Sequence, residues 1–226
     1  EGVHHVTCIT GNAPANVEFY AGELGLRMVK KTVNQDDPTV YHLFYADENG
    51  SAGADMTFFE YPDAPPGRAG DGMVHTVAFR VGSEESLDFW ERRVGGRRED
   101  GTLTFEDPEG LRLQLVVDTT GEKPLTANAP DIPEEHRIRG FAGVRAYASD
   151  PSRSRRLLEA LGFEPEWVAR GDDRSGFYAY DAAPDARGLQ AGGTVHHVAW
   201  ASLMDEHDAW RDRVIEGGAQ PTPVID

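Results

Sequence analysis

The sequence Gly2-Val3-His4-His5-Val6-Thr7 returns almost unchanged near the other end of the chain as Thr194-Val195-His196-His197-Val198-Ala199. Each copy has the alternation of a β-strand, in which every second side chain points to the same face of a sheet. His5 therefore shares one face with Thr7, and His197 shares one face with two alanines, while bulky apolar residues face the other way. Small or polar neighbours beside one histidine describe a site lined by strands. The repeat predicts a metal ion held by His5 and His197.

The length of 226 residues is enough for one large domain or two small ones with a substantial core. No apolar run approaches the roughly 18 residues of a membrane span, and no charged-then-apolar leader precedes the first strand, so no membrane association is expected. Because the chain starts at Glu1 and not at a methionine, we expect a trimmed N-terminus. The single cysteine, Cys8, excludes an internal disulfide framework and favours a reducing cytoplasm.

The composition is strongly acidic, with 39 Asp and Glu against 22 Lys and Arg and a formal charge of −17. Bulk electrostatics therefore argue against nucleic acid or anionic lipid as a partner. The only lysines are Lys30, Lys31 and Lys123. An acidic, arginine-using and lysine-poor surface resembles proteins of salt-loving organisms, and an acidic mesophilic surface is the alternative.

A βαβββ pattern repeats along the chain. In the first module a helix from Asn12-Ala13-Pro14 to Leu24 follows the first strand, and further strands are predicted at 27–33, 40–46 and 55–61. The second module has a strand at 74–81, a helix from Ser83 to the Gly95-Gly96 pair, and short strands at 103–106 and 111–118. Residues 119–139 are polar, contain three prolines and form the predicted linker.

The later modules look shorter. The third has a strand at 141–148, a helix after Asp150-Pro151, and strands at 166–170 and 177–180. The fourth has the second His-His strand and a helix before Gly217-Gly218. We therefore predict an α+β fold of four tandem βαβββ modules that form two half-closed, barrel-like sheets, the third and fourth modules being incomplete. The predicted division is an N-terminal pair of modules at 1–118, a linker at 119–139 and a C-terminal pair at 140–226.

Repeated βαβββ modules with a histidine on the first strand resemble the vicinal oxygen chelate superfamily, which includes glyoxalases, fosfomycin and bleomycin resistance proteins and extradiol dioxygenases. The runs LGLRMVKKTVN at 24–34 and YHLFY at 41–45, with the two His-His words, resemble more closely the hydroquinone ring-cleaving dioxygenases. The resemblance implies an aromatic diol and dioxygen as substrates. It also implies ferrous iron held by two histidines, which correspond to His5 and His197, and by one glutamate beyond Asp226.

The resemblance further implies supporting catalytic roles for His4, Thr7 and His196. Because successive side chains of a strand point to opposite faces, His4 and His196 should point away from the face that carries His5 and His197. A direct role for them in catalysis therefore requires a bend at the start of each strand. An arginine and a tyrosine used by the family would lie beyond residue 226, as would the glutamate. We therefore expect the chain as given to be catalytically incomplete, with Glu60 the nearest carboxylate that could substitute, although parity places Glu60 on the opposite face.

Only the first and fourth modules keep a histidine at the ligand position, because Thr76 and Gly143 take it in the second and third. The first module should therefore face the fourth, and the second should face the third. In the second module Gln114 stands where many relatives carry a chelating glutamate, which predicts a metal-free half. Four other residues are predicted without a role in metal binding, as strand histidines or core tryptophans: His42, His75, Trp90 and Trp210.

Two other functions fit the same pattern. A glyoxalase-like isomerase or lyase would use Zn, Ni or Mn, and it would require a fuller ligand set and a general base. A binding module of the bleomycin-resistance type would hold a ligand between modules without a metal, although the duplicated histidines argue against it. Fold similarity alone does not separate these functions, because the superfamily hosts many chemistries. Assembly into a homo-oligomer stays open.

Overall fold

The computed structural model describes residues 2–35, 37–164, 168–170 and 174–223. The first of its two sheets carries strands from both ends of the chain. Its order is β13 (Val195–Trp200), β1 (Val3–Thr10), β4 (Asp55–Glu60), β3 (Tyr41–Ala46) and β2 (Arg27–Val33). β13 therefore extends the sheet of the first module, next to β1.

The second sheet has eight strands. Its order is β10 (Phe163–Glu164), β11 (Val168–Arg170), β12 (Ser175–Ala182), β9 (Phe141–Ala148), β5 (Val74–Val81), β8 (Arg112–Val117), β7 (Thr102–Glu106) and β6 (Arg97–Glu99). The fold is thus α+β, as predicted, with two sheets that do not close into barrels.

The modules pair through their first strands. β1 runs antiparallel to β13, and β5 runs antiparallel to β9. These two pairings confirm that the first module faces the fourth and that the second faces the third. Each sheet therefore combines strands from before and after the predicted linker, in which the structure places one short 3-10 turn, η2 (Glu134–His136). The predicted boundaries at 118 and 140 divide the chain into consecutive segments, whereas each sheet contains strands from both segments.

Two helices cover the N-terminal modules. α1 (Ala13–Val17) starts at Asn12, whose side chain accepts a hydrogen bond from Ala15 N, and it continues into the π-helical segment η1 (Glu18–Glu23). The wider π turn lets the neighbours Phe19 and Tyr20 both enter the core. α2 (Glu84–Val94) starts at Ser83 and buries Trp90 completely, so the prediction of Trp90 as a core residue is confirmed.

The core lies on the helix-facing side of the first sheet. Val6 is the cross-strand partner of Met56, and Leu43 that of Phe58, and all four side chains are buried. The Tyr20 ring packs against Phe58 with the ring centres 4.6 Å apart. Each such side chain stabilises the fold by roughly 1.5–3 kcal/mol when fully buried. The opposite face of this sheet is left to polar and aromatic residues.

The third module is complete, contrary to the expectation from sequence. After β9 come the turn η3 (Pro151–Ser154), the helix α3 (Arg155–Ala160) and three strands, β10, β11 and β12. β10 was missed because it has only two residues, and β6 in the second module was missed because Arg-Arg-Glu carries no apolar signal. Part of the strand predicted at 166–170 lies outside the described residues.

The prediction of Trp210 as a core residue is wrong. Trp210 lies on α4 (His207–Glu216), which follows the turn η4 (Met204–Glu206) and buries none of its side chains. Its indole donates a hydrogen bond to Glu206, and the Arg213 guanidinium lies over its ring. Among the described residues α4 packs mainly against α3, and none of its side chains is fully buried.

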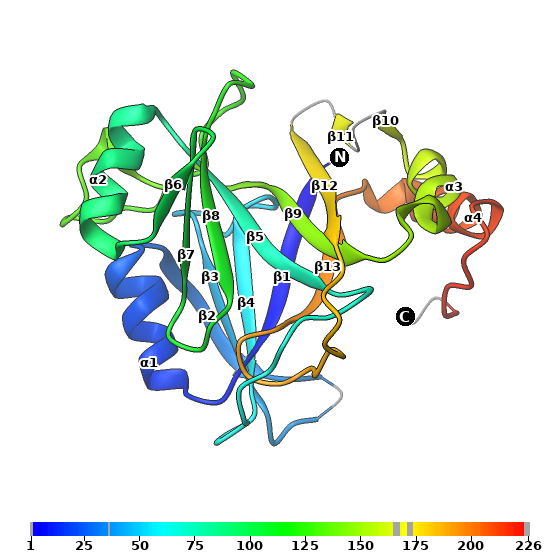
Figure 1. Ribbon diagram of the computed structural model, residues 1–226, viewed down its shortest axis with the longest axis horizontal. Coiled ribbons are helices and arrows are strands. Elements are labelled where there is room, and N and C mark those ends of the chain that lie inside the picture. The colour runs from blue at the N-terminus through cyan, green and yellow to red at the C-terminus, as the bar shows by residue number, and fades with distance from the viewer. Residues whose placement is uncertain (1, 36, 165–167, 171–173, 224–226) are drawn as a thin grey trace.

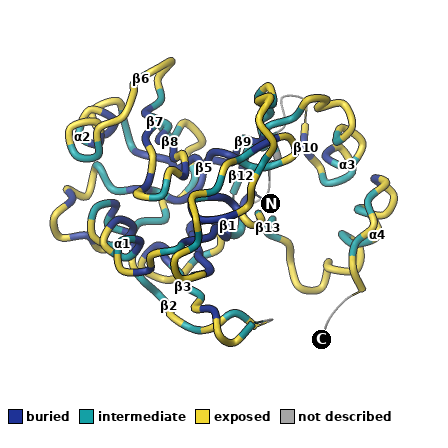
Figure 2. The backbone as a smooth tube through the Cα atoms, turned by 60° about the horizontal axis from the view of Figure 1, so that its bottom comes forward, coloured by how far each residue is buried: buried dark blue, intermediate teal, exposed yellow. Residues whose placement is uncertain are grey.

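The arrangement is visible in two views. Figure 1 shows the first sheet largely behind the second, with α1 and α2 at one side and α3 and α4 at the other. Figure 2 shows buried residues concentrated in the central strands, whereas α4 is half-buried to exposed along its length. None of the described helices is long and apolar enough to cross a membrane.

Candidate metal centre

The residues with metal-binding chemistry share the open face of the first sheet. In register, His5 pairs with Ala199 on β13, and Thr7 pairs with His197. Thr7 is also the partner of Thr57 on the parallel strand β4. The side chains that strand alternation predicts to share a face therefore do lie on one face of the assembled sheet.

His5 and His197 converge, as predicted. Their Nε2 atoms lie 3.2 Å apart although 192 residues separate them in sequence. An ion about 2.1 Å from both nitrogens would subtend an angle of roughly 100°, because half of 3.2 Å over 2.1 Å gives half that angle. This angle is close to that of neighbouring positions on an octahedral or tetrahedral ion. The two imidazoles therefore fit one first-row metal ion.

The other ring nitrogens of this pair are also engaged. His4 Nδ1 lies 3.0 Å from His5 Nδ1, and His196 Nδ1 lies 2.9 Å from His197 Nδ1. The bends that parity required are present, because the β1–β13 register shifts between Val3 and His5 and again at His196. A hydrogen bond at Nδ1 fixes the tautomer and orientation of a ligating imidazole and leaves Nε2 free for the metal.

A hydrogen-bonded chain leads away from the two ligand candidates. Thr7 Oγ1 lies 3.0 Å from His197 Nε2 and 2.8 Å from Thr57 Oγ1. Thr57 Oγ1 in turn lies 3.0 Å from His42 Nε2 on β3. The structure thus connects His42 to the centre. The sequence signal was available in the alternation of YHLFY, which puts His42 and Phe44 on one face, but the register of β3 against β4 cannot be derived from one strand.

Burial keeps these imidazoles neutral. The pKa of His5 is lowered to about 4, first by burial and then by the neighbouring His197, His4 and His42. The pKa of His42 is also lowered to about 4, by burial and then by His197 and Lys30. Burial lowers the pKa of His197 as well, with a further contribution from His196. A neutral imidazole is the form that binds a metal, so no proton has to leave the ligand nitrogens before an ion binds.

Two carboxylates stand on β4, the strand next to the one that carries His5. Glu60 lies at the far end of β4 and accepts a hydrogen bond from Ala13 N at 3.2 Å, so it caps α1 and does not reach His5. Within the described residues, no group of three His, Cys, Asp or Glu side chains is close enough to hold one metal ion. Asp55 is the partner of His5 in register, and burial followed by the charge of Asp47 raises its pKa to about 6.

The equivalent face of the second sheet has different chemistry. A cavity of about 580 Å³ is lined there by Thr76, Gln114 and Arg145 among others. Arg145 forms two hydrogen bonds with Asp181, at 2.8 and 2.5 Å, and His75 Nε2 lies 2.9 Å from the same carboxylate. Thr76 and Gly143 stand here at the positions of His5 and His197, and a guanidinium–carboxylate pair lies beside them in place of converging imidazoles.

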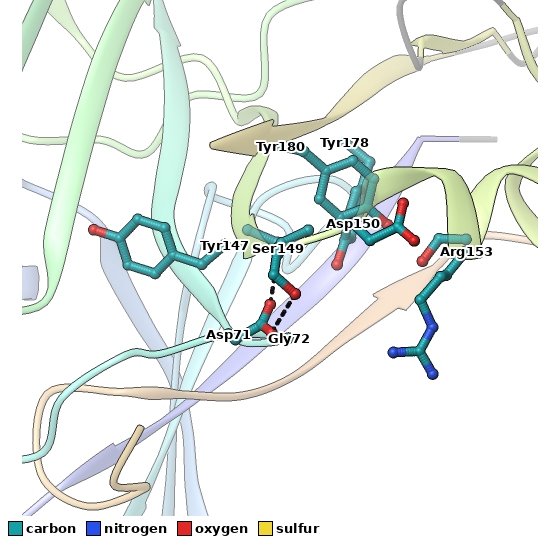
Figure 3. A pocket seen from close by; sticks show the side chains of 11 residues that line it. Asp71, Gly72, Tyr147, Ser149, Asp150, Arg153, Tyr178 and Tyr180 are labelled. Carbon is teal, nitrogen blue, oxygen red and sulfur yellow. Dashed lines mark hydrogen bonds between the residues drawn. The ribbon is translucent and has the colours of Figure 1, made fainter. Parts of the chain in front are cut away.

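A separate hollow of about 500 Å³ lies at the end of β9. Figure 3 shows residues that line it, with Tyr178 and Tyr180 close together and the Tyr147 ring turned away from them; Ser149 N and Oγ donate hydrogen bonds to Asp71 at 2.8 and 2.6 Å. The described residues that line it include no histidine. It is therefore distinct from the metal centre.

Comparison with known proteins places the chain in a family. The model of the Glyoxalase/Bleomycin resistance protein/Dioxygenase superfamily matches residues 2–115. MhqO of Bacillus subtilis (strain 168), provisionally named a ring-cleaving dioxygenase, is 35% identical over 243 residues, which cover 100% of this chain and 77% of MhqO. The chlorohydroquinone/hydroquinone 1,2-dioxygenase of Sphingobium indicum is 31% identical over 154 residues, 62% of this chain and 48% of that enzyme.

A solved structure agrees with these matches. The crystal structure of a provisionally named dioxygenase from Bacillus subtilis has a TM-score of 0.87 and 33% identity, covering 100% of this chain and 78% of that one. The resemblance inferred from the His-His words and from the runs at 24–34 and 41–45 is confirmed at the level of the superfamily. The chain belongs to the glyoxalase/bleomycin resistance protein/dioxygenase superfamily.

Proposed function

We propose that this protein is a metal-dependent ring-cleaving dioxygenase that acts on hydroquinone-like aromatic diols. The observation that carries the proposal is the pair of Nε2 atoms of His5 and His197 at 3.2 Å, on a sheet face that also holds aromatic rings. The names of the relatives MhqO and the Sphingobium hydroquinone 1,2-dioxygenase support the same reaction class.

The ion would be ferrous iron, held by His5 and His197 through Nε2. When bound, iron supplies a template on which diol and dioxygen meet in a reactive electronic state. The glutamate that the resemblance implies beyond Asp226 stays an expectation. The convergence of two neutral imidazoles argues against a metal-free binding module, because such a module has no need of this geometry.

The chain's own residues orient the ligands and handle protons. His4 and His196 hold the Nδ1 atoms of the two ligands at 3.0 and 2.9 Å. His196 is exposed and its ring lies edge-on to Phe59, with ring centres 5.3 Å apart, so it borders the space where a substrate ring would lie. From there it can take the proton of an approaching hydroxyl. Thr7 contacts Nε2 of His197, the atom that would bind the metal, so a bound ion would replace this contact.

The test is oxygen uptake by the full natural protein loaded anaerobically with ferrous iron. We expect one iron per chain and oxygen consumption on addition of hydroquinone, with none from the protein loaded with Zn. His5→Ala with His197→Ala should abolish both iron binding and uptake, whereas the matched control His207→Ala, which changes an exposed histidine, should not. Stoichiometric iron without oxygen uptake for any aromatic diol would show that the protein is not a ring-cleaving dioxygenase.

A further inference from the structure

His42 lies on the sheet face that holds the proposed metal ligands, but on a strand that is not adjacent to theirs. It stands on β3, two strands away from His5 in the order β1, β4, β3. At about 4.8 Å per strand, this separation is roughly 10 Å, too far for His42 to share an ion with His5. His42 therefore has no part in the pair at the metal, yet it faces the same space.

One aromatic side chain spans the interval. The Phe59 ring centre lies 6.4 Å from that of His197 and 4.4 Å from that of His42. On its other side His42 packs against Phe44, with the ring centres 4.0 Å apart. A substrate ring that contacts the small exposed part of Phe59 would thus have one end at the proposed metal ligands and the other end at His42. Aromatic side chains favour this kind of offset or tilted ring contact.

The His42 ring has one nitrogen left for a ligand. Nε2 lies 3.0 Å from Thr57 Oγ1, and Nδ1 has no hydrogen-bonding partner among the residues that the structure describes. The ring is half-buried, so an unmet nitrogen there gains from a polar ligand atom. Burial, followed by His197 and Lys30, lowers the pKa of His42 to about 4 and keeps the imidazole neutral, and a neutral imidazole can accept a hydrogen bond from a hydroxyl.

Lys30 adds a positive charge at this end. Its Nζ lies 5.8 Å from the centre of the Phe44 ring, and Lys30 is the partner of Phe44 in register. The side chain is exposed, and the described residues include no carboxylate paired with it. In a chain of net charge −17, a cation beside an aromatic wall favours a ligand oxygen that carries partial negative charge.

We propose that His42 binds the second hydroxyl of the diol and thereby selects substrates whose hydroxyls lie at opposite ends of the ring. This role rests on the proposed function and names a specificity residue for it. A 1,4-diol places one oxygen near His5 and His197 and the other near His42. A 1,2-diol places both oxygens at the metal end and leaves His42 without a partner.

The test measures binding apart from turnover. Hydroquinone and catechol are titrated anaerobically into the full natural protein loaded with Zn, by calorimetry or by quenching of tryptophan fluorescence. The variants are His42→Phe, which keeps the ring packing, and His42→Gln, which keeps a hydrogen-bonding group. The control is Tyr41→Phe, on the same strand and half-exposed beside Lys31. Thermal melting of each variant verifies that it is folded.

We expect His42→Phe to weaken hydroquinone binding about tenfold, the effect of losing one hydrogen bond, and to leave catechol binding unchanged. His42→Gln should lose less, and Tyr41→Phe should bind both diols as the wild type does. An equal loss for the two diols, no loss for either, or a wild-type protein that binds neither diol would overturn the role of His42. Selective binding without oxygen uptake by the iron protein would instead refute the proposed dioxygenase activity and leave the role of His42 intact.

Discussion

Glu109, in the turn between β7 and β8, holds Thr10 at the end of β1. Its carboxylate accepts hydrogen bonds from Thr10 Oγ1 at 2.5 Å and from Gly11 N at 2.7 Å. Its carbonyl oxygen lies against Gly193, so close that a Cβ there would meet it at 2.2 Å. The turn of the second module thus fastens the strand that carries His5 and the loop that leads to His197.

We expect Glu109→Ala to lower the free energy of unfolding by about 2 kcal/mol, because two hydrogen bonds to a charged group are lost. Glu106→Ala, an exposed glutamate on the neighbouring strand, is the matched control and should change it little. Urea denaturation followed by circular dichroism measures both. Equal stability of the two variants would show that the contact does not hold the modules together.

The histidines behind the ligands should tune metal affinity. We expect His4→Phe and His196→Phe each to weaken metal binding by about 10–100-fold, since each removes the partner of a ligand Nδ1. His5→Ala and His197→Ala should weaken it further, because they remove the ligands themselves. Competition with a chromophoric chelator gives the affinities. The assignment of His5 and His197 fails if their variants bind metal as well as the wild type does.

Acid should destabilise the protein partly through His75. Burial lowers its pKa from 6.5 to about 4, although Asp181 opposes the shift. Because the folded pKa is below the unfolded one, the unfolded state takes up the proton first, so stability is complete above about pH 6.5 and is lost as the pH falls toward 4. This loss amounts to about 3 kcal/mol.

The comparison is the pH dependence of the melting temperature in the wild type and in His75→Phe, which keeps an aromatic ring against Tyr147 and cannot be protonated. We expect a flatter curve between pH 6.5 and 4 for the variant, whatever its absolute stability. His207→Phe, at an exposed position, should keep the slope of the wild type. Parallel curves for all three proteins would contradict the role of His75.

Salt should stabilise the chain. With a net charge of −17, neighbouring carboxylates repel one another, and this repulsion is screened beyond about 8 Å at 0.15 M salt and about 3 Å at 1 M. We expect the melting temperature to rise from dilute buffer to molar KCl. A flat or falling curve would rule out adaptation to high salt.

The sequence predicts well where its pattern is periodic and duplicated. The two His-His sequences predict which side chains of β1 and β13 share a face, because the alternation of side chains along a strand is a local property. They also predict that His5 lies close to His197. β6 and β10 are missed since their pairing depends on neighbouring strands and not on their own residues. His42 is missed as part of the centre for a related reason: its distance from Thr57 depends on the register between two strands, which no single stretch encodes.

Trp210 shows the opposite kind of failure. Its helix repeats the Trp-x-x-x-Val spacing of α2, where Trp90 is fully buried, and the pattern alone gives no reason to expect a difference. Whether a helix face is buried, however, depends also on the surface that packs against it, and the sequence of the helix does not contain that information. Among the described residues α4 packs mainly against α3, whereas α2 packs against β7 and β8, so the same apolar stripe is buried on α2 and not on α4.

The meeting of His5 with His197 has a consequence for the order of events in the cell. The two ligands are made 192 residues apart, an interval of roughly 10 to 40 s at typical rates of synthesis. Over that time the nascent chain exposes β1 without its partner β13, so no two-histidine cage exists to capture an ion. The ion that we propose for this site can therefore be held by both histidines only after β13 has been made, and it is selected by what is available at that stage and not while β1 is being made.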